Sequence, residues 1–197
     1  MINLAILGST RGSSMLPIIE AIRQGRLSAN IKIIISNKVD AMILERAETY
    51  HLPHLWLDAK GCTREEYDQK ISAVLQQQDV QLVLLIGYMR ILSESFVTEW
   101  QDRLLNVHPS LLPAFAGKMD LEVHRAVLEA GVKETGCTVH LVTQEVDAGP
   151  IVVQKRCLVL ATDTAESLKA RVQGLEGEAL VEAVQRFCDT AYNMGRF

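Results

Sequence analysis

The sequence predicts an α/β fold built on a doubly wound mixed sheet, parallel in its N-terminal half and antiparallel near its C-terminus. Short apolar runs without polar alternation recur through the first half, which is typical of strands covered on both faces. Amphipathic stretches of helical spacing separate these runs, so parallel βαβ units are expected there. Near the C-terminus a short polar segment joins two strand-like runs, which favours antiparallel pairing.

Strand and helix alternate through the first half, and several boundaries are marked. Thr63 with Glu66 three residues later forms a capping-box pattern. Asp40 is the expected cap of another helix, and Gly25 ends the first one. The expected strands are 2–8, 31–37, 55–58 and 80–88, and the expected helices are 13–25, 40–50, 63–78 and 93–100.

A strand is expected to begin at Leu104 and to end at Pro109, because proline cannot donate to a sheet. After it, the regular alternation of strand and helix stops. Gly174 and Gly177 are expected to soften the last helix. The remaining expected elements are helices at 120–131 and 164–187 and the two strands of a hairpin at 136–143 and 149–160.

Composition excludes several classes of protein. A chain of 197 residues buries a sizeable core without disulfides or metal. Its net charge of −4 argues against a nucleic-acid backbone as the main partner. The four cysteines show no metal-binding spacing and are expected to be small buried hydrophobes. No apolar run approaches the ~18 residues of a membrane span, and the N-terminus lacks a basic signal region, so a cytoplasmic protein is expected.

Polar groups fall at predicted strand ends, where doubly wound, Rossmann-like sheets bind their ligands. Asn106 and His108 lie two residues apart in one strand, so their side chains point to the same side. They are either polar groups delivered to a binding site or the solvated tip of an edge strand. Gly8 and Gly87 fall at the ends of two other strands.

The segment GSTRGSS, residues 8–14, lies between the first strand and the first helix. Backbone amides and the positive helix end make such a junction a natural phosphate site. The hydroxyls of Ser13 and Ser14 and the cation of Arg11 would add charge-assisted contacts. The segment has neither the dinucleotide nor the Walker pattern, and the alternative is a Gly/Ser turn that only caps the helix.

Three further polar residues each have two interpretations. Arg90, in GYMRIL, is either a snorkelling surface side chain or the neighbour of a flat ligand. His140 is either a core histidine or a member of a site. Asp147 is either a turn former or a carboxylate that favours the protonated form of His108 and fixes its tautomer.

Three segments together resemble the phosphoribosylglycinamide formyltransferases of the folate-dependent formyltransferase superfamily. They are GYMRIL at 87–92, NVHPSLLP at 106–113 and GCTVHLVTQEVDAGPIVVQ at 136–154, and the similarity extends over nearly the whole chain. The resemblance implies transfer of a formyl group from the co-substrate 10-formyltetrahydrofolate to the amine of glycinamide ribonucleotide. That reaction is a step of de novo purine (IMP) biosynthesis.

The resemblance also implies the residues of the site. It implies catalytic roles for Asn106, His108 and Asp147. It implies that glycinamide ribonucleotide is bound by Gly12, Ser13, Ser14, Gln173 and Glu176. It implies that the folate is bound by Arg64, Met89, Arg90, Ile91, Leu92, Asn106, His140, Val142 and Asp147. A single domain over 1–197 is expected, with a phosphate-substrate half at 1–100 and a catalytic and folate half at 101–197.

Two segments depart from the pattern of the resemblance. Many relatives carry two histidines shortly after the PAFxG segment, whereas the loop 117–124 keeps only His124 and is a few residues longer. Thr10 and Arg11 precede Gly12 where relatives often have Gly-Asn, so Arg11 is a candidate for an extra phosphate contact.

The residue types suit formyl transfer, which passes through a tetrahedral intermediate with a developing oxyanion. Asn106 can donate to that oxygen, and a His108 imidazolium can do so more strongly. Asp147 would stabilise the charged His108 and help relay the proton that the amine loses. No metal is expected, because the formyl donor is already activated.

Three rival functions share part of this pattern. A formyltetrahydrofolate hydrolase would share the three catalytic residues but normally adds an N-terminal regulatory domain. A methionyl-tRNA formyltransferase would add a C-terminal RNA-binding domain and a basic surface. A non-catalytic nucleotide-binding module would leave Asn106 and His108 without a role. The expected partners are glycinamide ribonucleotide and 10-formyltetrahydrofolate, without nucleic acid or membrane, in a monomer or homodimer.

Overall fold

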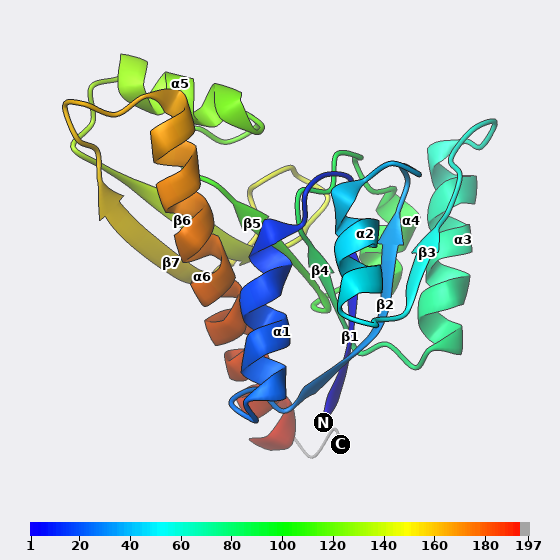
Figure 1. Ribbon diagram of the computed structural model, residues 1–197. Coiled ribbons are helices and arrows are strands. Elements are labelled where there is room, and N and C mark those ends of the chain that lie inside the picture. Colours follow the sequence, from blue (N-terminus) through cyan, green and yellow to red (C-terminus); the bar gives the residue numbers. More distant parts are fainter. Residues whose placement is uncertain (194–197) are drawn as a thin grey trace. The chain divides into compact units, whose positions relative to one another are not determined.

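The computed structural model describes residues 1–193 and confirms the predicted fold class (Figure 1). Seven strands follow the order β3-β2-β1-β4-β5-β6-β7. The chain forms two compact units, one of residues 1–13 and 28–106 and the other of residues 14–27 and the chain from Val107 onward. Residues 194–197, the end of the expected half 101–197, lie outside the described residues.

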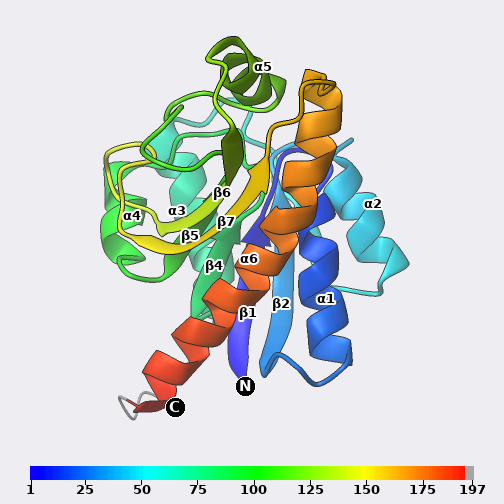
Figure 2. The same cartoon turned by 90° about the vertical axis from the view of Figure 1, so that its left-hand side faces the viewer.

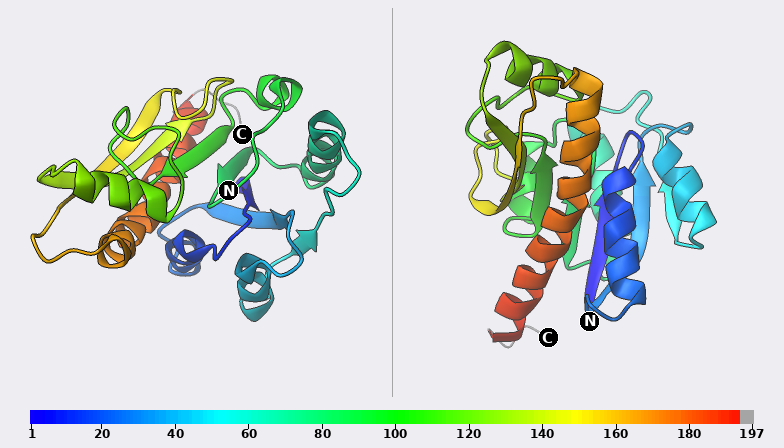
Figure 3. Two further views of the ribbon diagram at one scale, coloured as in Figure 1. Left: turned by 90° about the horizontal axis from the view of Figure 1, so that it is seen from above. Right: turned by 60° about the vertical axis from the view of Figure 1, so that its left-hand side comes forward.

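The first unit is a parallel sheet with helices on both faces. Each strand pairs in parallel with its neighbour from β3 through β5. Helix α2 lies on one face of these strands, and α3 and α4 lie side by side on the other (Figure 3). The elements are β1 (Ile2–Leu7), β2 (Ala29–Ser36), α2 (Met42–Thr49), β3 (His54–Trp56), α3 (Arg64–Gln77), β4 (Leu82–Leu85), α4 (Glu94–Glu99) and the first three residues of β5 (Leu104–His108).

The second unit is an antiparallel hairpin packed on a long helix. Strands β6 and β7 pair antiparallel, as predicted, and α6 runs along both with α1 beside it (Figure 2). Gly177 permits that approach, since a Cβ there would lie 2.4 Å from Cγ of Pro17. The elements are α1 (Leu16–Arg23), α5 (Leu121–Glu129), β6 (Glu134–Leu141), β7 (Ile151–Leu158) and α6 (Ala165–Asn193), and a 3-10 turn, Ser13–Met15, precedes α1.

The central strands are buried as their composition predicts. All four residues of β4 and five of the six residues of β1 are buried, which is expected of parallel strands with helices on both faces. Of the cysteines, only Cys137 is buried, and the other three are half-buried free thiols. Within residues 1–193, no helix has both the length and the apolar character needed to cross a membrane.

Three expected boundaries were wrong. Asp40 does not cap α2, because the carbonyl of Thr10 accepts the N–H of Ile43 and replaces a side-chain cap. Helix α6 is continuous through Gly174 and Gly177 and extends past 187, since packing on β6 and β7 supports it. Strand β4 is shorter than 80–88, because Gly87 takes a left-handed φ of 58° that ends the extended backbone.

The predicted capping box of α3 is confirmed. The hydroxyl of Thr63 accepts the N–H of Glu66 at 3.2 Å, and the Glu66 carboxylate accepts the N–H of Thr63 at 2.8 Å. Both contacts satisfy amides that the helix itself leaves unpaired, and both are exposed to solvent.

We expect Thr63→Ala to lower the free energy of unfolding by about 1 kcal/mol, the typical cost of losing a helix cap. Chemical denaturation of the variant and the wild type measures this difference. Gln69→Ala, at an exposed position of the same helix, is the control and should change stability by no more than a few tenths of a kcal/mol. Equal losses in the two variants would contradict a contribution of the cap.

Candidate active site

Strand β5 carries the two polar residues that the sequence singles out. Asn106 is half-buried, and His108, the last residue of the strand, is only 4% exposed. Because they are two residues apart in one strand, both side chains lie on the same side of it. His108 is therefore not part of a solvated strand tip, which was the alternative interpretation of this residue.

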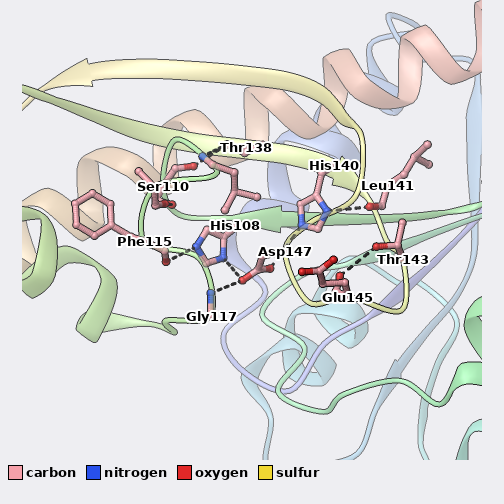
Figure 4. Close-up of polar contacts among 12 residues, drawn as sticks. His108, Ser110, Phe115, Gly117, Thr138, His140, Leu141, Thr143, Glu145 and Asp147 are labelled. Carbon is pink, nitrogen blue, oxygen red and sulfur yellow. Dashed lines mark hydrogen bonds and ion pairs between the residues drawn. The ribbon is translucent and has the colours of Figure 1, made fainter.

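The loop after β5 is fastened to the hairpin by a buried threonine. Thr138 of β6 donates its hydroxyl to the carbonyl of Ser110 at 2.7 Å and accepts the N–H of Leu112 at 3.0 Å (Figure 4). Gln154 of β7 donates to both the Leu112 carbonyl and the Thr138 hydroxyl at 3.0 Å. These bonds fix the backbone that follows His108.

His108 lies against Asp147, which comes from the turn between β6 and β7. Nδ1 of His108 is 3.3 Å from Oδ2 of Asp147, and Nε2 is 3.2 Å from the carbonyl of Phe115. The same Asp147 oxygen accepts the N–H of Gly117 at 2.9 Å (Figure 4). Asp147 has a left-handed φ of 55°, a conformation that aspartate tolerates better than most residues.

His140 completes this buried group. Its Nε2 lies 3.7 Å from the second oxygen of Asp147, and its Nδ1 lies 2.9 Å from the carbonyl of Leu141. His140 is thus both a buried strand residue and a neighbour of the carboxylate. The group of His108, Asp147 and His140 is called the carboxylate–imidazole cluster below.

Asp147 favours the protonated form of His108, in the expected direction, but burial of the ring has the larger and opposite effect. Burial lowers the pKa of His108, and the opposing effects of Asp147 and the Phe115 carbonyl do not fully offset it. Burial alone would raise the pKa of Asp147, but the His140 imidazole 3.7 Å away, the hydrogen bond from the Gly117 N–H and the nearby His108 outweigh it, so that pKa lies below its usual range. Asp147 is therefore ionised, and the neutral form of His108 is favoured.

Two of the residues implied to bind the ribonucleotide are in direct contact. Ser14, in the 3-10 turn before α1, donates its hydroxyl to Oε2 of Glu176 on α6 at 2.6 Å, and both side chains are buried. Burial raises the pKa of Glu176 to about 7, against a smaller lowering by the Ser14 hydrogen bond. Gln173 lies one turn earlier on the same helix and is half-buried.

Gly12 has a structural reason to be glycine. Its φ is +64°, and a Cβ there would lie 2.4 Å from Cγ1 of Ile43 in α2. Any side chain at this position would push against that helix before a ligand is considered. The loop after β1 is thus packed closely, whatever its amides bind.

The segment 87–93 passes close to α3. The Arg90 guanidinium lies over the ring of Tyr67, 4.6 Å from its centroid, so Arg90 has a flat neighbour within the protein itself. Met89 and Ile91 expose their side chains, Ile91 to 61%. Arg64, the first residue of α3, is exposed, and Val142 is half-buried.

The atypical loop 117–124 leads into a buried histidine. His124 of α5 is 1% exposed, and within the described part of the chain its Nδ1 has no hydrogen-bond partner. Burial lowers its pKa to about 4, so it is neutral at physiological pH. Asp120, just before α5, forms an ion pair with Lys169 of α6.

Several contacts that shape the site were not predicted from the sequence. Thr138, Gln154, the Phe115 carbonyl and the Gly117 amide have ordinary local sequence contexts, and their partners lie up to 42 residues away. Nothing in the sequence pattern marks them. Among residues 1–193, no group of His, Cys, Asp and Glu side chains is arranged to hold a metal ion.

We expect the raised pKa of Glu176 to make stability fall as pH rises. From its ordinary value of 4.5 up to about 7, the unfolded chain loses the Glu176 proton while the folded protein keeps it. Glu176→Gln keeps an oxygen for Ser14 and removes the titration. The free energy of unfolding should therefore fall less between about pH 5 and about pH 8 in this variant than in the wild type.

Glu178→Gln, at an exposed position of the same helix, is the matched control and should keep the wild-type pH dependence. Parallel pH profiles for the wild type and Glu176→Gln would show that the buried carboxyl does not titrate as stated.

Comparison with known proteins places the chain among formyl transferases. The sequence profile of that family, described as formyl transferase, matches residues 2–184. The chain is 37% identical to a phosphoribosylglycinamide formyltransferase of Escherichia coli (strain K12), over 98% of this chain and 90% of that protein. It is 40% identical to the trifunctional purine biosynthetic protein adenosine-3 of Gallus gallus over 98% of this chain, but it spans only 19% of that protein.

Solved structures agree with the sequence comparison. The crystal structure of glycinamide ribonucleotide transformylase 1 from Symbiobacterium toebii matches with a TM-score of 0.92 and 40% identity, covering 96% of this chain and 89% of that one. The phosphoribosylglycinamide formyltransferase from Brucella melitensis matches with a TM-score of 0.87 and 38% identity, covering 94% and 95%. The resemblance seen in the sequence is thereby confirmed, and the chain belongs to the formyl transferase family, among the relatives of the phosphoribosylglycinamide formyltransferases.

Proposed function

We propose that the chain transfers the formyl group of 10-formyltetrahydrofolate to the amine of glycinamide ribonucleotide, giving formylglycinamide ribonucleotide in de novo purine biosynthesis. The observation that carries the proposal is the buried contact between His108 and Asp147 at the end of a strand that also holds Asn106. An amide, an imidazole and a carboxylate are the groups that acyl transfer to an amine requires. Family membership and full-length similarity to formyltransferases support the same function.

In the proposed mechanism, His108 moves the proton. Nδ1 of His108 faces the ionised Asp147 and Nε2 faces the Phe115 carbonyl, which can only accept, so both nitrogens have an acceptor when the ring is protonated. The neutral His108 ring accepts the proton that the attacking amine loses and returns it to the nitrogen that leaves the formyl carbon. The C–N bond to the amine forms, the C–N bond to the folate breaks, and the proton count balances.

Asn106 and His108 act on the oxyanion of the tetrahedral intermediate. The Asn106 amide donates to this oxygen, and a negative oxygen beside His108 raises the pKa of the imidazole as it forms. His108 therefore becomes charged as negative charge develops, which stabilises the transition state more than the ground state. Asp147 stabilises that charge across the 3.3 Å contact.

The two substrates have separate groups of residues in this proposal. Glycinamide ribonucleotide places its phosphate on Gly12, Ser13 and Ser14 and its ribose on Glu176 and Gln173, with Arg11 as an additional cation. The folate contacts the segment Met89–Leu92 and the His140–Asp147 turn, with Arg64 for its acidic end. The Ser14–Glu176 hydrogen bond supports the first assignment because it joins a phosphate residue to a ribose residue.

The function is tested by incubating the full-length chain with 10-formyltetrahydrofolate in the presence and absence of glycinamide ribonucleotide. Tetrahydrofolate and formylated ribonucleotide should appear together, and only when the ribonucleotide is present. Release of formate without the ribonucleotide would indicate a hydrolase instead. Binding of the ribonucleotide without any turnover of the folate would indicate a nucleotide-binding module.

We expect Asp147→Asn to lower turnover by roughly 10²–10⁴-fold, the usual range for losing a general acid–base contribution. The variant keeps the shape of the side chain but removes the charge that stabilises protonated His108. Because residues that act as a unit are not additive, His108→Ala with Asp147→Asn should be little slower than His108→Ala alone. The measurement is the turnover rate at saturating concentrations of both substrates, for the wild type, the two single variants and the double variant.

Both single variants should still bind the ribonucleotide, which calorimetry checks independently of turnover. Losses that multiply in the double variant would mean that Asp147 acts on its own, and the proposed proton path would be wrong.

A further inference from the structure

A buried carboxylate outside the carboxylate–imidazole cluster has no role in the proposed mechanism. Asp68 of α3 is 1% exposed, and its Oδ2 accepts the main-chain N–H of Ser93 at 2.5 Å. Burial raises the pKa of Asp68, while the Ser93 hydrogen bond and the nearby Arg90 charge lower it in part. Burying a carboxylate costs free energy unless it is paired, so this placement requires an explanation.

The hydrogen bond from Ser93 anchors one end of a short segment whose other end is also anchored. The N–H of Met89 donates to the hydroxyl of Ser9 at 2.9 Å, and Ser9 itself donates to Asn37 at 2.6 Å. The main chain of Arg90, Ile91 and Leu92 lies between the two anchors. Within the described part of the chain, the N–H and C=O groups of these three residues have no hydrogen-bond partner.

The same turn of α3 contacts this segment a second time. The ring of Tyr67 lies under the Arg90 guanidinium, and the Tyr67 hydroxyl donates to the carbonyl of Leu57 at 3.0 Å. Tyr67 and Asp68 are neighbours on α3, so one helical turn holds both the middle and the end of the segment. Arg64, which begins the helix, lies one turn earlier.

The unpaired main-chain groups indicate the chemistry of their ligand. Three consecutive residues with open N–H and C=O groups present alternating donors and acceptors, which a flat heterocycle with ring nitrogens, an amino group and a carbonyl can pair with. The exposed side chain of Ile91 leaves the segment accessible. Main-chain recognition of this kind depends on the backbone being held in one conformation, because ordering it on binding would cost free energy.

We propose that Asp68 is a positioning residue for the folate co-substrate: by accepting the Ser93 N–H, it holds the Arg90–Leu92 main chain ready to pair with the heterocycle. The inference rests on the proposed function for the identity of the ligand. It differs from a purely structural role, in which Asp68 would only fasten the start of α4. Ser93 is the cap of that helix, so the two roles need an experiment that separates them.

The test is Asp68→Asn, which keeps an oxygen acceptor and the side-chain shape but removes the charge. A charge-assisted hydrogen bond is roughly twice as strong as a neutral one, so we expect KM and Kd for 10-formyltetrahydrofolate to rise roughly tenfold. KM for glycinamide ribonucleotide should stay within about twofold of the wild type, because Asp68 is not among the residues proposed to bind the ribonucleotide. Calorimetry gives Kd for the folate without turnover.

The matched control is Ser72→Ala, one turn later on α3. Ser72 is buried, donates to Glu99 at 2.6 Å and accepts the indole N–H of Trp100 at 2.9 Å, so it also joins α3 to α4. This variant should lose stability but keep the wild-type folate Kd. A similar rise in folate Kd for Ser72→Ala would show that general α3–α4 packing, and not Asp68, positions the segment, which would overturn the inference.

A second variant covers the case in which Asp68→Asn does not fold. Asp68→Glu keeps the charge but displaces it by one methylene, and it should also raise the folate Kd selectively; an unchanged Kd would overturn the inference.

Failure of the proposed function can be distinguished from failure of this inference. If the wild type transfers no formyl group yet binds the folate in an Asp68-dependent manner, the function is wrong and the positioning role stands.

Discussion

The contact between His108 and Asp147 constrains the whole end of the sheet on which it lies. A carboxylate that is largely removed from water needs several partners, and here they come from three segments: His108 at the end of β5, Gly117 in the following loop and His140 on β6. The turn that carries Asp147 must then close tightly. Gly149 allows this, since a Cβ there would lie 1.8 Å from the carbonyl of Leu141.

The carboxylate–imidazole cluster and the Ser14–Glu176 contact each remove a carboxyl group from water, with different results for its charge. In the cluster, charge is concentrated on Asp147 and the surrounding groups donate to it. At the Ser14–Glu176 contact, the Ser14 hydroxyl donates to the carboxyl but burial has the larger effect and raises the pKa of Glu176 to about 7, so a proton stays on it up to neutral pH. One carboxyl is thus kept charged and the other close to half-protonated at neutral pH, because the neighbouring donors and charges outweigh burial at Asp147 and do not outweigh it at Glu176.

The sequence predicted those features that depend on neighbouring residues. The alternation of apolar strands and amphipathic helices, the hairpin and the capping box at Thr63 all follow from local pattern, and they are present. The cap at Asp40 failed because Thr10, distant in sequence, supplies the competing carbonyl. The Ser14–Glu176 contact joins residues 162 positions apart, and only the family resemblance, not spacing, suggested that they share a ligand.

In the candidate site, too, the features set by neighbouring residues were predictable and those set by distant contacts were not. Asn106 and His108 were recognisable because strand geometry places residues two apart on one side. The lowered pKa of His108 could not be predicted from the sequence. It depends on how deeply the ring is buried by segments that are distant along the chain. Nothing in the sequence distinguished Asp68 from other polar residues of an amphipathic helix. The contact that singles it out is with the N–H of Ser93, 25 residues away.

The half-protonated state of Glu176 at neutral pH has a thermodynamic consequence for any ligand that donates a hydrogen bond to it. Such a ligand favours the ionised carboxylate, so binding expels a proton into the surrounding buffer. The measured heat of association then contains the ionisation enthalpy of whichever buffer accepts that proton. The affinity itself becomes linked to pH, because the free energy of deprotonating Glu176 is part of the free energy of binding.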